Sequence, residues 1–179
     1  MILVQSDPLK IVSTFHKYVK PTIHPILSPF CTLLTGISQE VVENSQTWQI
    51  VYQDFLDWLD VNAVDRNQCL FVSDGPWDVR DFIGKELNYH EISRPSFMHR
   101  ILDIRKHYAK KYDRQSTNLN GMLLGLNMEF EGREHSGLDD AKNVYRIFEK
   151  MIADGFKMEA NTDLRKNKPK KGAWTKLRK

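Results

Sequence analysis

Hydrophobic and polar residues along the chain follow patterns that predict strands first and helices afterwards. Apolar residues at positions 2, 4, 11, 15 and 18 stand among polar neighbours, on both sides of Asp7-Pro8. This spacing predicts two adjacent strands joined by a turn. Prolines at positions 21, 25 and 29 predict an irregular stretch up to about residue 30, because proline lacks the backbone N–H that regular structure uses.

Later segments carry apolar residues at three- and four-residue spacing, which predicts helices with one apolar face. The predicted helices are residues 38 onward, 47–61, 77 onward, 105–112, 119–126 and 137–153. Between them, the apolar run Cys69–Val72 predicts a buried strand that leads into a loop, and residues 101–104 predict another strand. Because strands come early and helices alternate later, the pattern predicts an α/β domain with a mixed central sheet flanked by helices.

Composition is that of a folded, soluble chain. Its 179 residues, 41% of them hydrophobic and 27% charged, fit one domain. No apolar run approaches the roughly 18 residues that span a bilayer, and the opening apolar residues are too few for a signal peptide. We therefore expect an intracellular protein of the cytoplasm or nucleus, with no membrane partner. Cys31 and Cys69 lie far apart without CxxC spacing, which argues against a zinc knuckle or a disulfide framework.

Positive charge gathers at the C-terminus. Eight of the fifteen residues from Arg165 to Lys179 are Lys or Arg. We expect a folded domain over residues 1–160 and a flexible basic tail over residues 161–179. Such a tail neutralises nucleic-acid phosphates, and Trp174 could stack on a base. A solubilising tail or a localisation signal explains the same charge.

Two short segments carry candidate chemistry. Asp78 follows the predicted strand Cys69–Val72 and opens a helix, so its carboxylate lies at the C-terminal edge of the sheet. His135 precedes Asp140 by five residues where a loop enters the last helix, and this spacing can place the imidazole and the carboxylate in one cleft. Considered singly, each has a structural explanation: the aspartates can cap helices, and the histidine can be solvated or structural.

Considered together, these residues match hydrolysis of a phosphodiester by two metal ions. Hard divalent cations such as Mg²⁺ prefer carboxylate oxygens. An imidazole, with an ordinary pKa of about 6.5, can take the proton from the attacking water. The residue types at Asp78, His135 and Asp140 are therefore compatible with such a reaction, and their individual roles stay open at this point.

The same residues resemble the second and third motifs of the DEDDh 3′-to-5′ exonucleases, a family with an RNase H-like fold. The loop Leu34-Thr35-Gly36-Ile37 is similar to the element that lies against the 3′-terminal nucleotide in that family. Within the family, the resemblance is to the enhanced-RNAi and histone-mRNA 3′ exonuclease group. It covers roughly residues 1–158 and rests on Thr14-Phe15, Tyr18–Pro21, Ser28–Cys31, Ser73–Asp78, Ile104–Lys106 and Gly132–Asp140.

This resemblance implies an RNase H-like exonuclease domain that uses two Mg²⁺ or Mn²⁺ ions. Its nucleic-acid partner would be the 3′ end of single-stranded RNA, with DNA as a further substrate. Asp78 and Asp140 would bind metal, His135 would act as general base, and residues 34–37 would bind the terminal nucleotide. Arg105 and Lys106 could approach phosphates, although a solvated helix start is the favoured interpretation for both.

One motif of the family is missing. Its first motif, Asp-x-Glu on the opening strand, occurs nowhere before Asp78, and the chain opens with residues similar to the family's second strand. We therefore expect a domain without its first strand and a chain with little nuclease activity. An incomplete gene model is the favoured explanation, beside a fragment and a non-catalytic paralogue. The alternative function is an RNA-binding or adaptor protein that keeps the 3′-end pocket.

Overall fold

The chain begins with a β-hairpin. In the computed structural model, which describes residues 1–165, β1 (Ile2–Ser6) pairs antiparallel with β2 (Leu9–Thr14) through a turn at Asp7-Pro8. The register shifts between Leu3 and Val4. The two adjacent strands predicted from the sequence are thus confirmed.

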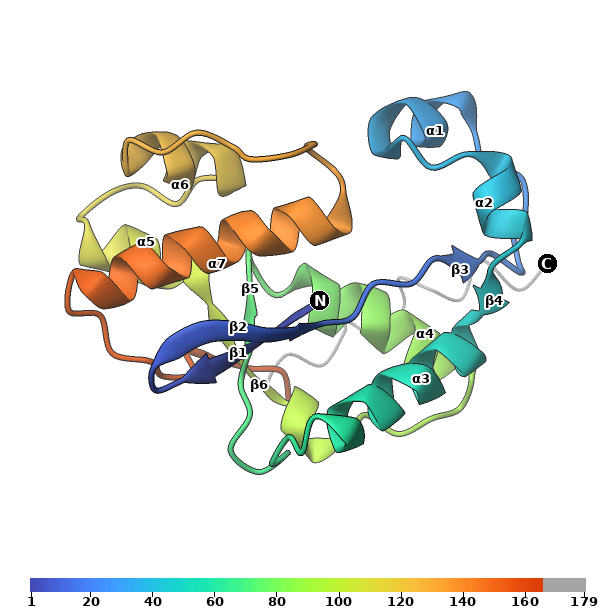
Figure 1. Ribbon diagram of the computed structural model, residues 1–179, viewed down its shortest axis with the longest axis horizontal. Coiled ribbons are helices and arrows are strands. Elements are labelled where there is room, and N and C mark those ends of the chain that lie inside the picture. Colours follow the sequence, from blue (N-terminus) through green and yellow to red (C-terminus); the bar gives the residue numbers. More distant parts are fainter. Residues whose placement is uncertain (166–179) are drawn as a thin grey trace.

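A small lobe of residues 19–47 follows the hairpin, and Figure 1 shows its helices standing apart from the rest of the molecule. The parallel pair β3 (Val19–Lys20) and β4 (Gln46–Thr47) closes it at its base. Between these strands lie α1 (Pro29–Thr35) and α2 (Gln39–Glu43). The hydroxyls of Ser28 and Ser38 cap the two helices by accepting backbone N–H bonds. The sequence pattern predicted α2 but not α1.

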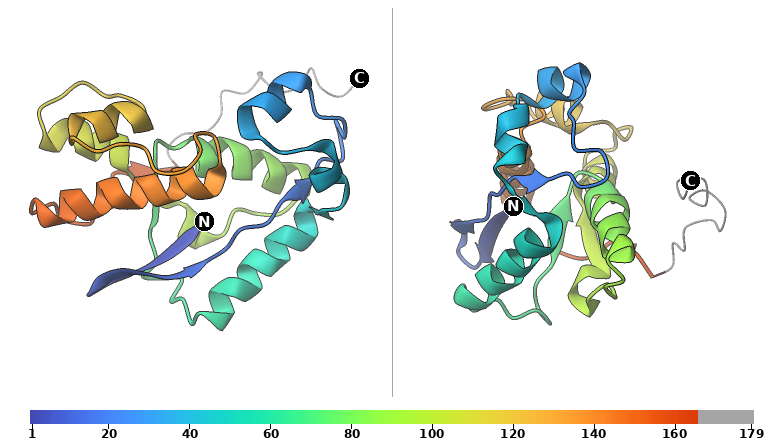
Figure 2. Two further views of the ribbon diagram at one scale, coloured as in Figure 1. Left: turned by 45° about the horizontal axis from the view of Figure 1, so that its top comes forward. Right: turned by 90° about the vertical axis from the view of Figure 1, so that its right-hand side faces the viewer.

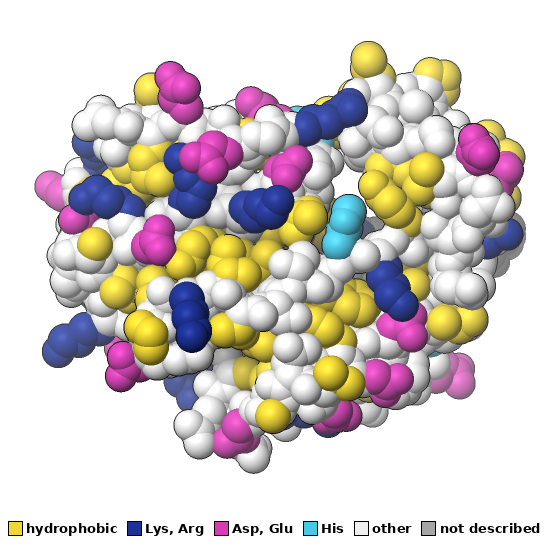
Figure 3. Space-filling model, viewed as in Figure 1, with side chains coloured by type: hydrophobic (Ala, Val, Ile, Leu, Met, Phe, Trp, Pro, Cys, Tyr) yellow, Lys and Arg dark blue, Asp and Glu magenta, His cyan; other side chains and the backbone are white. Residues whose placement is uncertain are grey.

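The central sheet is mixed, as predicted. β5 (Phe71–Ser73) runs parallel to β6 (Arg100–Asp103), and β6 runs antiparallel to β7 (Thr162–Asp163). Within the described residues, this three-stranded sheet and the β1–β2 hairpin are separate hydrogen-bonded sheets. The long helix α7 (Gly137–Ala153) packs against both β1 and β5. Figure 3 shows hydrophobic side chains along the face between α7 and the hairpin.

Two clusters of buried side chains cover the two faces of β6. Ile101 belongs to the cluster under α3 (Trp48–Val61) and α4 (Ile83–Tyr89), and its neighbour Leu102 belongs to the cluster under α7. This alternation follows from the two-residue period of a strand. The second cluster also contains side chains of α5 (Ile104–Lys111) and α6 (Leu119–Gly125). Helices thus flank the sheet, which confirms the predicted α/β class, and Figure 2 gives two further views of this arrangement.

Some boundaries differ from the sequence prediction. Ile104 was predicted in a strand, but β6 ends at Asp103, whose carboxylate accepts the Lys106 N–H and so starts α5. Packing also continues past residue 160, because β7 pairs with β6 and Leu164 is buried. Of the basic tail predicted over residues 161–179, residues 166–179 lie outside the described residues. Within residues 1–165, the helices are all too short or too polar to cross a membrane.

Candidate active site

Asp78 lies where β5 gives way to a helix. The strand leads into a tight loop in which the Ser73 hydroxyl donates to the Gly75 carbonyl at 2.6 Å. Gly75 has a φ of +86°, and a Cβ at this position would overlap the Trp77 ring. Asp78 then opens a π-helical turn (Asp78–Phe82) that continues into α4. Such turns are rare and occur frequently at functional sites.

An arginine neutralises one carboxylate beside Asp78. Arg105 donates to both oxygens of Asp74, with Nε–Oδ1 at 2.8 Å and Nη2–Oδ2 at 2.7 Å. Its guanidinium also lies 4.8 Å from the centre of the Trp77 ring. The solvated role favoured for Arg105 from the sequence is therefore wrong. Lys106 donates to the Thr162 hydroxyl at 2.8 Å.

Asp140 and His135 are neighbours at the start of α7. The Asp140 N–H donates to the Ser136 carbonyl at 2.8 Å, which places Asp140 in the first turn of the helix. The backbone N–H of His135 lies close enough to the Asp140 carboxylate to lower its pKa. His135 lies on the preceding loop in a left-handed conformation, with a φ of +63°. The imidazole is thus on the loop and the carboxylate one turn into the helix.

Asp78 and Asp140 lie near enough for the charge of one carboxylate to act on the other. Although part of Asp78 faces solvent, desolvation by surrounding protein raises its pKa, and the charges of Asp74 and Asp140 raise it further. Desolvation likewise raises the pKa of Asp140, against the opposing effect of the His135 N–H. The folded state therefore binds protons more tightly than the unfolded state, so stability falls as pH rises through these raised pKa values. A cation between the two carboxylates would relieve this repulsion.

These carboxylates suit a hard divalent cation in type but supply only part of a ligand set. Asp74 is occupied by Arg105, which leaves Asp78 and Asp140. In the part of the chain that the structure describes, no three His, Cys, Asp or Glu side chains gather as a metal site. Two cations in one site use more carboxylates than these two.

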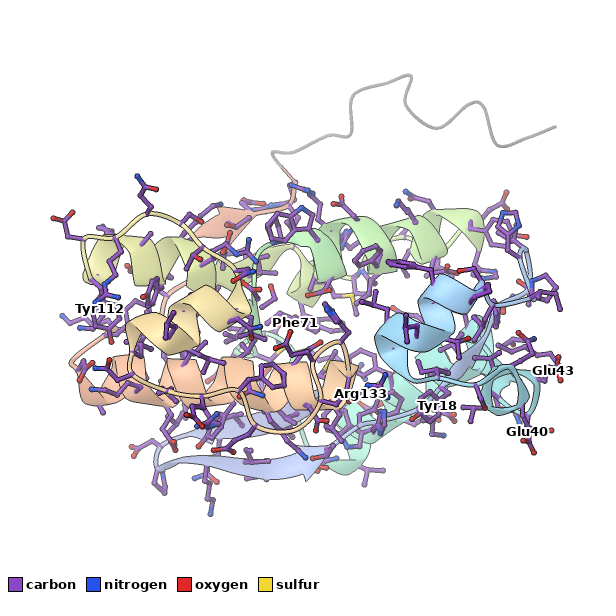
Figure 4. All side chains as sticks on the ribbon, turned by 90° about the horizontal axis from the view of Figure 1, so that it is seen from above. Tyr18, Glu40, Glu43, Phe71, Tyr112 and Arg133 are labelled. Carbon is purple, nitrogen blue, oxygen red and sulfur yellow. The ribbon has the colours of Figure 1, made fainter. Side chains whose placement is uncertain are left out.

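The predicted nucleotide-binding residues lie across from the His135 loop. Leu34 and Thr35 end α1, and Gly36 terminates the helix with a φ of +73°. The Ile37 N–H donates to the Thr35 hydroxyl at 3.2 Å. Arg133, two residues before His135, donates to the Leu33 carbonyl at 3.1 Å, so the two segments are in contact. Figure 4 shows Arg133 on the loop that precedes α7, beside α1.

Sequence reasoning assigned no role to Arg133. It lies in the quoted stretch Gly132–Asp140, but its partner is 100 residues away, and neither periodicity nor spacing reveals such a contact. A cavity of about 460 Å³ lies elsewhere, lined by residues that include Arg66, Cys69 and Phe97. It opens at the end of the parallel strands opposite Asp78, so it is not part of the candidate site.

Asn143 fixes the loop that leads to Arg133 and His135. The side chain is fully buried, and it donates to the Glu131 and Asp139 carbonyls at 2.8 and 2.9 Å. Its oxygen accepts the Glu131 N–H at 3.1 Å. We expect Asn143→Ala to lower the free energy of unfolding by about 2–4 kcal/mol, since it leaves buried backbone groups without partners.

Urea unfolding followed by circular dichroism measures this change. The matched control is Lys142→Ala on the exposed side of the same turn, which should cost less than about 0.5 kcal/mol. Equal losses in the two variants would contradict the anchoring role of Asn143.

Known proteins match this chain over most of its length. Residues 1–148 match the family RNase_T, described as exonuclease. The human protein "3'-5' exoribonuclease 1" is 35% identical over 164 residues, which are 90% of this chain and 47% of that protein. The chain thus spans about half the length of this curated relative.

Two solved structures share the fold. One is described as the "nuclease domain of 3'hExo, a DEDDh family member, bound to rAMP", with a TM-score of 0.87, 34% identity, and coverage of 90% of this chain and 82% of that one. The other is described as "3'-end specific recognition of histone mRNA stem-loop by 3'-exonuclease", with a TM-score of 0.85, 32% identity, and coverage of 90% and 73%. The chain belongs to the DEDDh, RNase T-like exonuclease family.

Proposed function

We propose that this chain is the nuclease part of a 3′-to-5′ exoribonuclease that acts on single-stranded RNA ends. The observation that carries the proposal is that Asp78 follows β5 and Asp140 lies in the first turn of α7, the helix that packs against β5, so that the charge of Asp140 acts on Asp78. These residues come from separate segments, and each alone has a structural explanation. Family membership supports the activity, and the residue roles are part of the proposal.

Each residue has one task in this reaction. Asp78 and Asp140 would hold Mg²⁺ or Mn²⁺ through their carboxylate oxygens. When bound, such cations neutralise the charge on the phosphate and make water a better nucleophile at neutral pH. His135, on the loop just before Asp140, accepts the proton of the attacking water. The products are nucleoside 5′-monophosphates.

Leu34, Thr35, Gly36 and Ile37 contact the 3′-terminal nucleotide in this proposal. Their segment touches the His135 loop through Arg133. A similar solved structure is bound to rAMP, and another concerns the 3′ end of a histone mRNA stem-loop. We infer an RNA 3′ end as the substrate, with DNA as a further one.

The 179-residue chain contains no Asp-x-Glu motif. We propose that this chain by itself has little nuclease activity. Two carboxylates leave the cations weakly bound and the water poorly placed. The same observation favours a second function, an RNA-binding or adaptor protein that keeps the 3′-end pocket. In that case the basic residues 165–179 would add salt-sensitive affinity without turnover.

Activity on a 5′-labelled single-stranded RNA in Mg²⁺ separates the two functions. One sample is the 179-residue chain. The other, the extended chain, is the same chain preceded by a strand that carries Asp-x-Glu. We expect the extended chain to shorten RNA from its 3′ end at least about a hundredfold faster, since metal-ion catalysis contributes several kcal/mol. RNA that is bound but not shortened by either chain would overturn the enzyme in favour of the adaptor.

A further inference from the structure

Arg133 satisfies a carbonyl that the end of α1 leaves open. The usual partner of the Leu33 carbonyl in a helix is the N–H of Ile37, which here donates to the Thr35 hydroxyl instead. The Arg133 guanidinium takes its place, with Nη2 at 3.1 Å from the Leu33 oxygen. A cation at the C-terminus of a helix is also favoured by the helix dipole.

The fit between Arg133 and Gly36 is close. A Cβ built on Gly36 would overlap all three of the terminal guanidinium atoms. The planar guanidinium therefore lies against bare backbone at the position where the helix ends. A lysine, with a compact ammonium group, cannot reproduce this flat contact.

Arg133 is itself fixed to the base of α7. Its backbone N–H donates to Asp139 Oδ2 at 3.1 Å, and its carbonyl accepts the Ser136 N–H at 3.2 Å. Gly132, with a φ of +88°, packs tightly against the Asp139 side chain. The segment that carries His135 is thus anchored at both ends, and Arg133 extends from it to α1.

Little else fixes the end of α1. None of the residues of this helix is buried, and Leu33 is 81% exposed. The side-chain hydrogen bonds of Ser28 and Thr35 stay within the helix and its caps. One charge-assisted hydrogen bond is therefore a large share of what positions residues 34–37.

We propose that Arg133 is a positioning residue that holds residues 34–37 against the His135 loop, so that the terminal nucleotide and the reacting water meet at a fixed separation. This inference rests on the proposed function for its catalytic consequence, but the contact itself can be tested without RNA. Among residues 1–165, the ion pairs do not include Arg133. The positive charge is thus left beside the site, where a phosphate of RNA would meet it.

Hydrogen exchange of the free 179-residue chain tests the contact. In Arg133→Ala and Arg133→Lys, we expect the amides of residues 34–36 to exchange about tenfold faster, with unchanged exchange in α7. Arg100→Ala is the matched control, because it removes the same charge at the opposite end of the parallel strands. Unchanged exchange at residues 34–36 in both Arg133 variants, or faster exchange throughout the chain, would overturn the proposal.

Affinity and kinetics test the consequence. Binding of a fluorescent single-stranded RNA should weaken roughly tenfold in both Arg133 variants, as expected for loss of one charge-assisted contact. In the chain extended with Asp-x-Glu, KM should rise by a similar factor and kcat should fall by less. If exchange rises while affinity and KM stay unchanged, the contact has no role in substrate positioning. If the extended chain does not shorten RNA at all, the proposed nuclease function is wrong. The hydrogen-exchange result on the Arg133 contact would still stand.

Discussion

Replacing Asp140 with asparagine is expected to lower the rate of RNA shortening by the Asp-x-Glu-extended chain about a thousandfold. The change removes one carboxylate charge from a site where Asp78 and Asp140 repel each other. Cation stabilisation of the reacting phosphate is worth several kcal/mol, and each 1.36 kcal/mol is a factor of ten in rate. The asparagine oxygen can still lie close to the His135 N–H, so the loop should keep its shape.

The rate is measured as release of 5′-monophosphates at saturating RNA, together with Mn²⁺ affinity by electron paramagnetic resonance. Asp57→Asn is the control, because Asp57 lies on α3 and bonds only to Gln53 in the described structure. Full activity in Asp140→Asn with an unchanged Mn²⁺ affinity would remove Asp140 from the site.

Replacing His135 with alanine is expected to lower kcat in the extended chain by about a hundredfold to ten-thousandfold, the usual contribution of a general base. KM should change little, because residues 34–37 and Arg133 stay in place. Added imidazole should restore part of the rate in His135→Ala, since a free base can enter the space that the ring vacates.

His24→Ala is the matched control for this variant, because His24 is exposed on the lobe of residues 19–47. It should keep the parent rate and show no response to imidazole. A rate in His135→Ala within twofold of the parent would assign proton transfer to another group.

The sequence was most informative where local pattern and tertiary packing agree. α7 begins and ends where the pattern predicted, because its apolar residues recur at helical spacing and form a buried face. α1 was missed for the opposite reason, since it has no buried residue and so no apolar stripe to detect. The strand β7 was missed because two residues are too few to show alternation.

The sequence predicted which residues belong to the candidate site. It did not predict most of the contacts that these residues and their neighbours make. The place of Asp78 after a buried strand and the five-residue spacing of His135 and Asp140 indicated these three residues, and their roles remain predictions. The ion pair between Asp74 and Arg105 joins segments 31 residues apart, and the contact between Arg133 and Leu33 spans 100 residues. Such long-range contacts form only in the folded chain, so no local sequence pattern predicts them.

At His135, the left-handed backbone makes a glycine more favourable for folding, whereas the proposed proton transfer needs the imidazole. Glycine would adopt a φ of +63° with no steric cost, whereas a residue with a Cβ pays about 1 kcal/mol there. Selection of variants for heat resistance alone would therefore enrich glycine at position 135 and discard the imidazole. Engineering this domain for longer shelf life should leave that position untouched and seek its gains elsewhere.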